Sequence, residues 1–198
     1  MILTRNPELG KCKTRLAAKI GDRAALQVYA FLLDHTRSIT QGLSMEKWVL
    51  YSEEIWESDI WDNAIFQKRL QQGVDLGQRM EHAFREGFRA GFGNIVIIGS
   101  DLFDLSQGDL ESAFSLLEEN DHVLGPAEDG GYYLLGMKAL EPKLFRGKAW
   151  SSDTVLADTL EDLKDKKVAL LPERNDVDRY EDIKDIKAFA PFIKHLDL

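Results

Sequence analysis

The chain has 198 residues, of which 44% are hydrophobic and 30% charged, as expected for a globular protein with a full core. A net charge of −9 argues against nucleic acid as a partner, and a single cysteine excludes an internal disulfide. No apolar stretch is long enough to span a membrane, and residues 1–20 carry no signal peptide. We therefore expect one domain over residues 1–198, located in the cytoplasm, with no membrane partner. The sequence leaves the oligomeric state open.

Charge is distributed unevenly along the chain. Residues 1–23 contain six basic and two acidic side chains, a balance of +4, so the remainder of the chain carries −13. A compact basic segment in an acidic protein favours binding of a small anion. A basic helix face exposed to water is the alternative, which charge alone does not exclude.

The first residues predict a strand followed by a phosphate-binding loop. Residues 1–4 resemble the end of a strand, and residues 5–10 have the composition of a loop. Glycine lets the backbone approach a phosphate, while amides, lysine and arginine bind its charge. The spacing differs from a Walker A motif. The residues of these types fall within six positions: Gly10, Lys11, Lys13, Thr14 and Arg15.

This stretch, RNPELGKCKTRL, resembles the motif KxPxxGxxKTRL that opens a bacterial family of glycosyltransferase-A-like proteins. That family consists mostly of uncharacterised transferases, similar to phospholactate guanylyltransferase and more distantly to sugar nucleotidyltransferases. The resemblance implies that Lys13 and Arg15 hold phosphates and that Gly10 gives close backbone approach. Lys11 and Thr14 belong to the same cofactor-binding loop. Relative to the family, the first strand looks shortened.

The next segments predict a helix over 21–42, a strand over 46–52 and an acidic loop with a short helix over 53–65. Residues 66–72 fit no single element. Asp75 is a plausible N-cap for the helix that follows, in which apolar residues recur every four positions.

The segment QQGVDLGQRM resembles the family's second motif, QxGxDLGxRM. The resemblance implies that Gln72, Gly77 and Arg79 contact the ligand. A capped helix with Arg79 on its surface explains the same residues without a ligand.

The stretch NIVIIGSDLFDL predicts the central strand of the sheet. Ile95 to Ile98 form an unbroken apolar run, typical of a parallel strand buried on both faces. Asp101 follows the carboxyl end of this strand, where open α/β sheets bind ligands, and a carboxylate there suits a hard divalent cation. A simple turn is the alternative. The stretch resembles the family's GSDxP motif, but Leu102 and Phe103 replace the small residue and proline, which leaves open a share in the role for Asp104.

The second half predicts a helix from Ser106, capped together with Asp109, then a strand over 121–125 and a hairpin turn at Asp129-Gly130. The segment GPAEDGGYYLLG resembles the family motif GPxxDGGYxLxG, which the related fold places over the substrate. The resemblance implies that Asp129 contacts substrate and that Gly130 and Gly131 let it approach, although a hairpin needs no ligand. Trp150 lines either an acceptor pocket or the core.

The last segments predict a helix to about residue 164, a strand over 167–171 and a final helix over 180–193. Magnesium binds six oxygens, using one or two carboxylates with phosphates and water, so Asp101 needs a second acid. The segment NDVDRYEDI resembles a late DVD segment of the family. Asp176 is our first candidate and Asp178 the second, since Asp178 could instead cap the final helix.

Together these patterns predict a three-layer α/β/α sandwich with a mainly parallel mixed sheet, of the nucleotide-diphospho-sugar transferase or GT-A type. The expected function is a transferase dependent on Mg²⁺ or Mn²⁺. Its substrate would be a nucleoside triphosphate or a nucleotide sugar, with an unknown acceptor. A nucleotide-binding accessory protein without catalysis is the alternative. The expected catalytic residues are Lys13, Arg15, Asp101 and Asp129.

Overall fold

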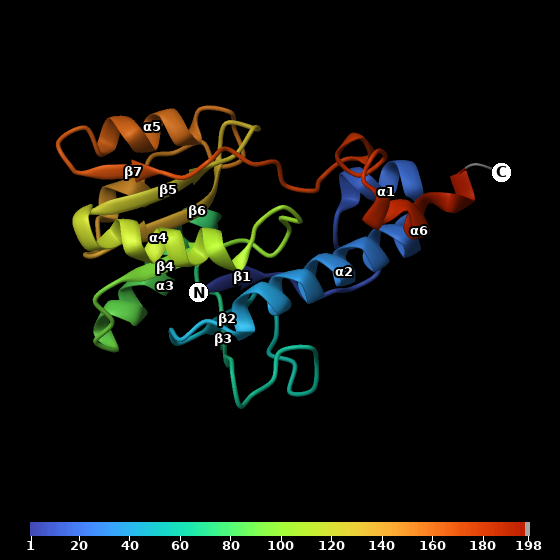
Figure 1. Cartoon of the computed structure of the whole chain (residues 1–198), viewed down its shortest axis with the longest axis horizontal. Coiled ribbons are helices and arrows are strands. Elements are labelled where there is room, and N and C mark those ends of the chain that lie inside the picture. Colours follow the sequence, from blue (N-terminus) through green and yellow to red (C-terminus); the bar gives the residue numbers. More distant parts are fainter. Residues whose placement is uncertain (197–198) are drawn as a thin grey trace.

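The computed structural model describes residues 1–196, which contain one seven-stranded sheet of order β3-β2-β1-β4-β6-β5-β7 (Figure 1). Strand β6 runs antiparallel to both of its neighbours, and the other pairs are parallel. The predicted mixed, mainly parallel sheet is therefore confirmed. The strands are β1 Ile2–Thr4, β2 Trp48–Tyr51, β3 Gln67–Leu70, β4 Ile95–Ile98, β5 His122–Pro126, β6 Tyr132–Met137 and β7 Val168–Leu170.

Strand β4 lies at the centre of the sheet, between β1 and β6, as its unbroken apolar run predicts. Its four side chains are all at least 96% buried, and they alternate between the two faces. Val96 and Ile98 belong to one hydrophobic cluster, whereas Ile95 and Ile97 belong to another. Both faces of the strand are therefore packed in hydrophobic clusters and shielded from water.

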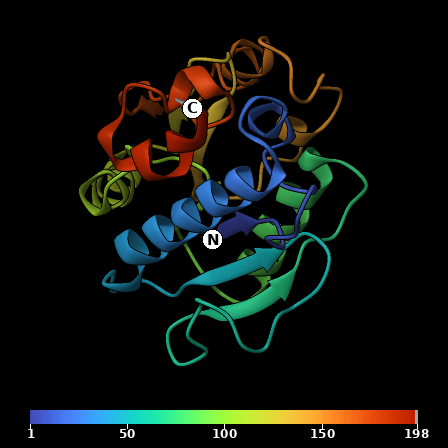
Figure 2. The same ribbon diagram turned by 90° about the vertical axis from the view of Figure 1, so that its right-hand side faces the viewer.

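Helices cover both faces of the sheet and complete the three predicted layers. Helices α2 and α4 contribute to the cluster of Val96, while α3 and α5 contribute to that of Ile97. Figure 2 shows the blue helix α2 running alongside strands β1 and β2. The helices are α1 Thr14–Ile20, α2 Asp22–Gln41, α3 Leu76–Arg89, α4 Gln107–Glu119, α5 Val155–Asp162 and α6 Ala190–Ile193.

A third cluster joins the two ends of the chain. Leu16 of α1 and Leu32 of α2 pack with Val177, Ile183 and Phe189 from the C-terminal segment. Accordingly, α1 and α6 lie at the same end of the molecule (Figure 1). This cluster brings the late acidic residues next to the basic loop that follows β1.

Two of the predicted elements are wrong. Residues 53–65 contain no helix; instead, the buried Lys68 holds this loop by donating to Asp59 Oδ1 at 2.8 Å and to the Trp56 carbonyl at 2.8 Å. The final helix is not continuous over 180–193. It consists of the 3₁₀ turns Tyr180–Asp182 and Lys187–Phe189 followed by α6. Proline at the start of α6 explains the restart, because proline fits the first turn of a helix but not its interior.

Within residues 1–196, no helix is both long enough and apolar enough to cross a membrane.

His122 makes stability depend on pH. Its ring is 4% exposed, and neither ring nitrogen has a hydrogen-bond partner among the described residues. Burial lowers the pKa of His122 below its ordinary value of 6.5, although Asp121 and Glu141 act in the opposite direction. Below pH 6.5 the unfolded chain therefore binds a proton that the folded chain does not, and stability falls as the pH drops.

We expect His122→Leu to reduce this loss of stability. Urea unfolding of the wild type and the variant at pH 7 and pH 5 checks the prediction. Other titrating groups are common to both proteins, so the difference between their two losses reports His122. Equal losses in both proteins would contradict it.

Candidate active site

The candidate site lies at the edge of the sheet where the parallel strands end. Because β6 is antiparallel, it begins at this same edge, and the hairpin turn before it joins the loops that follow β1, β4 and β7. Backbone hydrogen bonds tie these loops together. Val177 donates to the carbonyl of Asp101 at 3.1 Å, and Glu128 donates to the carbonyl of Arg174 at 3.0 Å.

Lys13 and Asp101 form an ion pair at the centre of this edge. Lys13 Nζ lies 2.9 Å from Asp101 Oδ2, and the lysine side chain is only 7% exposed. Burial alone would lower the pKa of Lys13, but the carboxylates of Asp101, Asp178 and Asp176 outweigh it and raise that pKa. Lys13 is therefore a fully charged cation held among acids.

The backbone of Lys13 is in the left-handed region, with φ 49° and ψ 47°, immediately before α1. A residue with a side chain adopts this conformation at a cost, and such residues persist where the surrounding structure holds them. Here Ala17 donates to the carbonyl of Lys13 at 2.8 Å. The conformation fixes the direction in which the lysine leaves the chain.

Arg15 and Asp178 form a second, more open pair. Arg15 Nη1 donates to Asp178 Oδ2 at 2.7 Å, and the arginine side chain is 63% exposed. Asp178 does not cap the turn that begins at Tyr180, because the carboxylate of Asp182 accepts from the backbone amides of Asp178 and Arg179 instead. The side chain of Asp178 thus faces the basic loop.

Asp176 is the acid whose negative charge is least balanced by a neighbouring basic side chain. It has no ion-pair partner in the part of the chain that the structure describes. Burial first, and then the negative charges of Asp101, Asp129 and Asp178, raise the pKa of Asp176 to about 6, despite the opposing charge of Lys13. Four carboxylates therefore share this edge closely enough to repel one another, and a cation there would relieve the repulsion.

These carboxylates do not form a complete cage for a divalent cation among the described residues. Among residues 1–196, no three acidic, histidine or cysteine side chains are close enough together to bind one ion. Mg²⁺ commonly uses only one or two carboxylates and takes its remaining oxygens from phosphates and water. In such an arrangement Asp101 and Asp176 would be the two carboxylates, since the negative charge of Asp101 raises the pKa of Asp176.

Other predicted ligand residues lie outside this cluster. Lys11 is exposed and pairs with Glu8 at 2.9 Å and Glu53 at 3.3 Å. Arg79 donates to the carbonyl of Gly73 at 3.2 Å and to Gln71 Oε1 at 3.3 Å, so it braces the loop before α3. Among the remaining predicted residues, Gly10 and Gln72 are exposed on the loops after β1 and β3, and Thr14 is the exposed first residue of α1.

Two glycines of the predicted motifs have packing partners within the chain. A Cβ on Gly77 would lie 2.5 Å from the indole of Trp150, and a Cβ on Gly130 would lie 2.2 Å from the carbonyl oxygen of Asp153. Because these glycines have no side chain, residues 150–153 can pack closely against α3 and the hairpin. Trp150 is half-buried and packs against the hydrophobic cluster that contains Ile97. Beside them, Asp129 accepts from the amide of Gly131 at 2.9 Å.

The turn after β4 is held by packing in place of proline. Leu102 is 3% exposed, and the ring of Phe103 packs on Phe189 with centroids 4.9 Å apart. The departure from the family motif therefore does not loosen the turn that carries Asp101. Asp104 points elsewhere, with its carboxylate 3.4 Å from Arg174 Nη1.

Tyr29 and Gln71 organise the site, and sequence reasoning missed both. The hydroxyl of Tyr29 accepts from the amide of Arg5 at 2.9 Å and lies 3.2 Å from Ser100 Oγ, joining the loops after β1 and β4. Gln71 Nε2 donates to the carbonyls of Thr4 and Leu50 at 2.9 and 2.8 Å. A single tyrosine on an apolar helix face carries no signal that would distinguish it from core.

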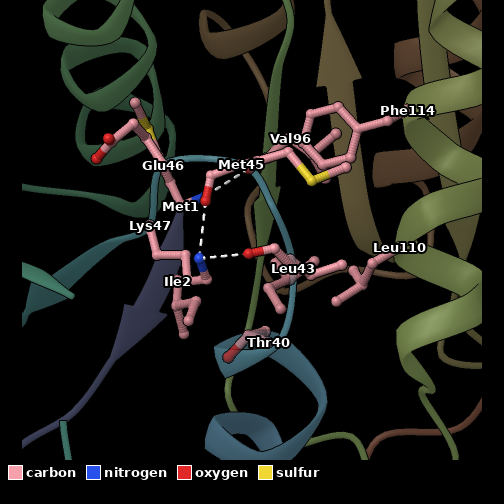
Figure 3. Close-up of a pocket in the computed structure, with 11 residues that line it drawn as sticks. Met1, Ile2, Thr40, Leu43, Met45, Glu46, Lys47, Val96, Leu110 and Phe114 are labelled. Atoms are coloured by element: carbon pink, nitrogen blue, oxygen red, sulfur yellow. Dashed lines mark hydrogen bonds between the residues drawn. The ribbon is translucent and has the colours of Figure 1, made fainter. Parts of the chain in front are cut away.

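A small, mostly apolar cavity of about 40 Å³ is at the opposite edge of the sheet and is separate from these residues. It lies between the end of α2 and helix α4. Figure 3 shows Lys47 at its rim, where Nζ donates to the carbonyls of Leu43 and Met45.

The fold is that of the nucleotide-diphospho-sugar transferases and related nucleotidyltransferases. The chain resembles the crystal structure of a protein from Desulfovibrio desulfuricans G20, provisionally described as a nucleotide-diphospho-sugar transferase. The TM-score is 0.85 and the sequence identity 29%, over 99% of this chain and 94% of that one.

The chain belongs to the family DUF2064, described as uncharacterized proteins conserved in bacteria, whose model matches residues 37–152. The family resemblance and the fold class expected from the sequence are therefore confirmed. The basic loop and the late acids Asp176 and Asp178 lie outside the matched segment. No curated protein matches the chain.

Two more distant structures share the fold alone. A cytidylyltransferase from Leptospira borgpetersenii serovar Hardjo-bovis has a TM-score of 0.58 at 18% identity, over 99% of this chain and 92% of that one. An inositol-1-phosphate CTP transferase from T. maritima has a TM-score of 0.56 at 14% identity, over 99% and 95% of the two chains.

Proposed function

We propose that this protein is a metal-dependent transferase acting on a nucleotide-activated substrate. The observation that carries the proposal is the meeting of Lys13 and Arg15 with Asp101, Asp176 and Asp178 at the ligand-binding edge of the sheet. The names of the structures that share this fold support it, since they describe nucleotide-sugar and cytidylyl transfer.

Each side chain has a role that follows from its charge and position. Lys13 and Arg15 bind the phosphates of the substrate and stabilise negative charge on the leaving phosphate as it develops. Asp101 and Asp176 hold Mg²⁺ or Mn²⁺, and the ion would supply further charge neutralisation at the same phosphate. Asp129, on the hairpin over the site, orients the substrate.

A thermal-shift panel tests this proposal directly. Nucleoside triphosphates and nucleotide sugars are compared with and without Mg²⁺ or Mn²⁺. Binding at 100 times the dissociation constant should stabilise the protein by about 2.7 kcal/mol. A panel in which no nucleotide stabilises the protein, with either metal, would contradict the proposal.

The released product then identifies the group that moves. Nucleotidyl transfer from a triphosphate releases pyrophosphate, whereas glycosyl transfer from a nucleotide sugar releases a nucleotide. Tight binding with neither product, across a panel of acceptors, would favour a nucleotide-binding accessory protein.

Alanine at either phosphate-binding residue should weaken nucleotide binding without unfolding the protein. For Lys13→Ala and Arg15→Ala we expect losses of roughly 1.5–3 kcal/mol each, because a charged partner of the phosphate is removed. Isothermal titration calorimetry with the best nucleotide of the panel measures the loss. Lys19→Ala is the matched control. Lys19 is a basic residue of the same helix as Arg15, but its ammonium group lies over the ring of Tyr180. Unchanged affinity in both variants would show that the basic segment is a solvated helix face.

A further inference from the structure

The pair formed by Lys13 and Asp101 has a consequence for the order in which ligands bind. We propose that, in the ligand-free protein, these two side chains block each other's binding sites. A metal ion and a phosphate each have to break the pair, so each ligand strengthens the binding of the other. This inference rests on the proposed function, because it assigns the metal to Asp101 and the phosphate to Lys13.

The geometry makes the competition direct. Lys13 Nζ is 2.9 Å from Asp101 Oδ2 and donates a hydrogen bond to it. A magnesium ion binds its oxygen ligands at about 2.0–2.1 Å, so an ammonium group and the ion cannot share that oxygen. The lysine side chain is 7% exposed, whereas that of Asp101 is 35% exposed. Removing Asp101 alone therefore leaves Lys13 as an uncompensated, largely buried charge.

The two other carboxylates offer no such barrier. Asp178 pairs with Arg15, whose side chain is 63% exposed and can move into solvent. Asp176 has no ion-pair partner among the described residues. A metal ion can therefore reach Asp176 and Asp178 without breaking a buried contact, and Asp101 is the position that Lys13 protects.

Binding both ligands removes the conflict. When Lys13 turns to a phosphate, Asp101 is released for the metal, and when the metal binds Asp101, Lys13 is released for the phosphate. The coupling must be equal in both directions, because it is a free energy shared by the two sites. In the ligand-free protein Lys13 and Asp101 consequently neutralise each other, and neither of these two side chains binds its ligand strongly alone.

Two variants test the proposal with probes that do not depend on the nucleobase. Lys13→Met should tighten the binding of Mn²⁺ alone, measured by electron paramagnetic resonance, by a factor within the usual range of about 5 to 150 for coupled sites. Asp101→Asn should tighten the binding of tripolyphosphate in metal-free buffer containing EDTA, measured by calorimetry, by a similar factor.

Matched charge changes separate this competition from general electrostatics. Arg15→Met removes one positive charge from the same edge, and Asp178→Asn removes one negative charge, but both residues belong to the exposed pair. We expect a much smaller effect of Arg15→Met on the binding of Mn²⁺ alone, and a much smaller effect of Asp178→Asn on the binding of tripolyphosphate. Equal effects of Lys13→Met and Arg15→Met, together with equal effects of Asp101→Asn and Asp178→Asn, would overturn the proposal.

The experiment also distinguishes this proposal from the proposed function. If the wild type binds no nucleotide in the presence of Mn²⁺, the proposed function fails, while the Mn²⁺ titrations still report the competition at Asp101. Circular dichroism establishes that each variant is folded. If Lys13→Met does not fold, Lys13→Gly removes the same charge. This variant should fold, because glycine adopts a φ of 49° without strain.

Discussion

Asp101→Asn is expected to lower the affinity for Mn²⁺ by about 100-fold or more when nucleotide is present. Changes in groups that merely orient a metal ligand already cost 10- to 100-fold in affinity, and the loss of a ligand itself should reach or exceed that range. The amide of asparagine keeps the size of the side chain but loses the negative charge. Titration with Mn²⁺, followed by electron paramagnetic resonance in the presence of nucleotide, measures the change.

The same titration decides which acid completes the site. We expect Asp176→Asn to show a large loss too, because Asp176 is close to Asp101 and has no basic partner among the described residues. Asp178→Asn should show a smaller loss, since Asp178 is paired with Arg15. If only Asp101→Asn loses affinity, the shared site is wrong. If none of the three does, Asp101 is not a ligand, and the proposed mechanism fails with it.

Gly130→Ala is expected to destabilise the protein by about 3 kcal/mol. Gly130 has a φ of 85°, which costs a residue with a side chain about 1–2 kcal/mol, and overpacking adds about 1–3 kcal/mol. The overpacking arises because the new methyl group would lie 2.2 Å from the carbonyl oxygen of Asp153. Backbone cannot move aside as a flexible side chain can. Urea unfolding measures the change in the free energy of unfolding.

Gly147→Ala is the matched control for this change. Gly147 has a φ of 66° but no atom within 4 Å of the position where a Cβ would lie. We therefore expect only the conformational cost of about 1–2 kcal/mol. Equal losses of unfolding free energy for Gly130→Ala and Gly147→Ala would show that the backbone at Asp153 moves aside at little cost. The hairpin would then not need glycine at position 130 to pack against Asp153.

Elements with a strong local signal were predictable from the sequence. The run Ile95–Ile98 identified the central strand, and the side chain of Asp75 caps α3 by accepting from the amide of Gln78, as expected. The capping box of Ser106 and Asp109 and the hairpin at Asp129-Gly130 were also predicted correctly. In each case a few neighbouring residues determine the backbone conformation.

Elements that depend on distant contacts were not predictable. Strand β3, with the sequence QKRL, shows no apolar alternation because it lies at the edge of the sheet. Its Lys68 is buried only because the loop at Asp59 folds over it. The C-terminal segment is similar, since Phe189 is held by Phe31 and Phe103 rather than by a helix of its own.

In the site, Lys13, Asp101 and Asp176 each lie on a segment that follows a predicted strand. We could therefore expect them at the same edge of the sheet. The pairing of Lys13 with Asp101 was not expected, because the choice of partner depends on the unusual backbone conformation of Lys13. The role of Tyr29 was missed for a related reason. Its hydroxyl gains its function from loops that are distant in sequence and meet only in the folded chain.

The order of strands in the sheet also bears on the synthesis of the protein. A ribosome releases the chain from its amino end, so β1, β2 and β3 emerge before β4, the partner that pairs Ile98 with Ile2. Strand β4 in turn gains its second neighbour only when β6 has emerged. The amide of Val177 and the ring of Phe189 then dock against the turn of Asp101 and Phe103. Pairings between distant segments form slowly, so the sheet of the nascent chain stays incomplete until β7 has emerged, and the candidate active site is completed only after Val177 and Phe189 have docked.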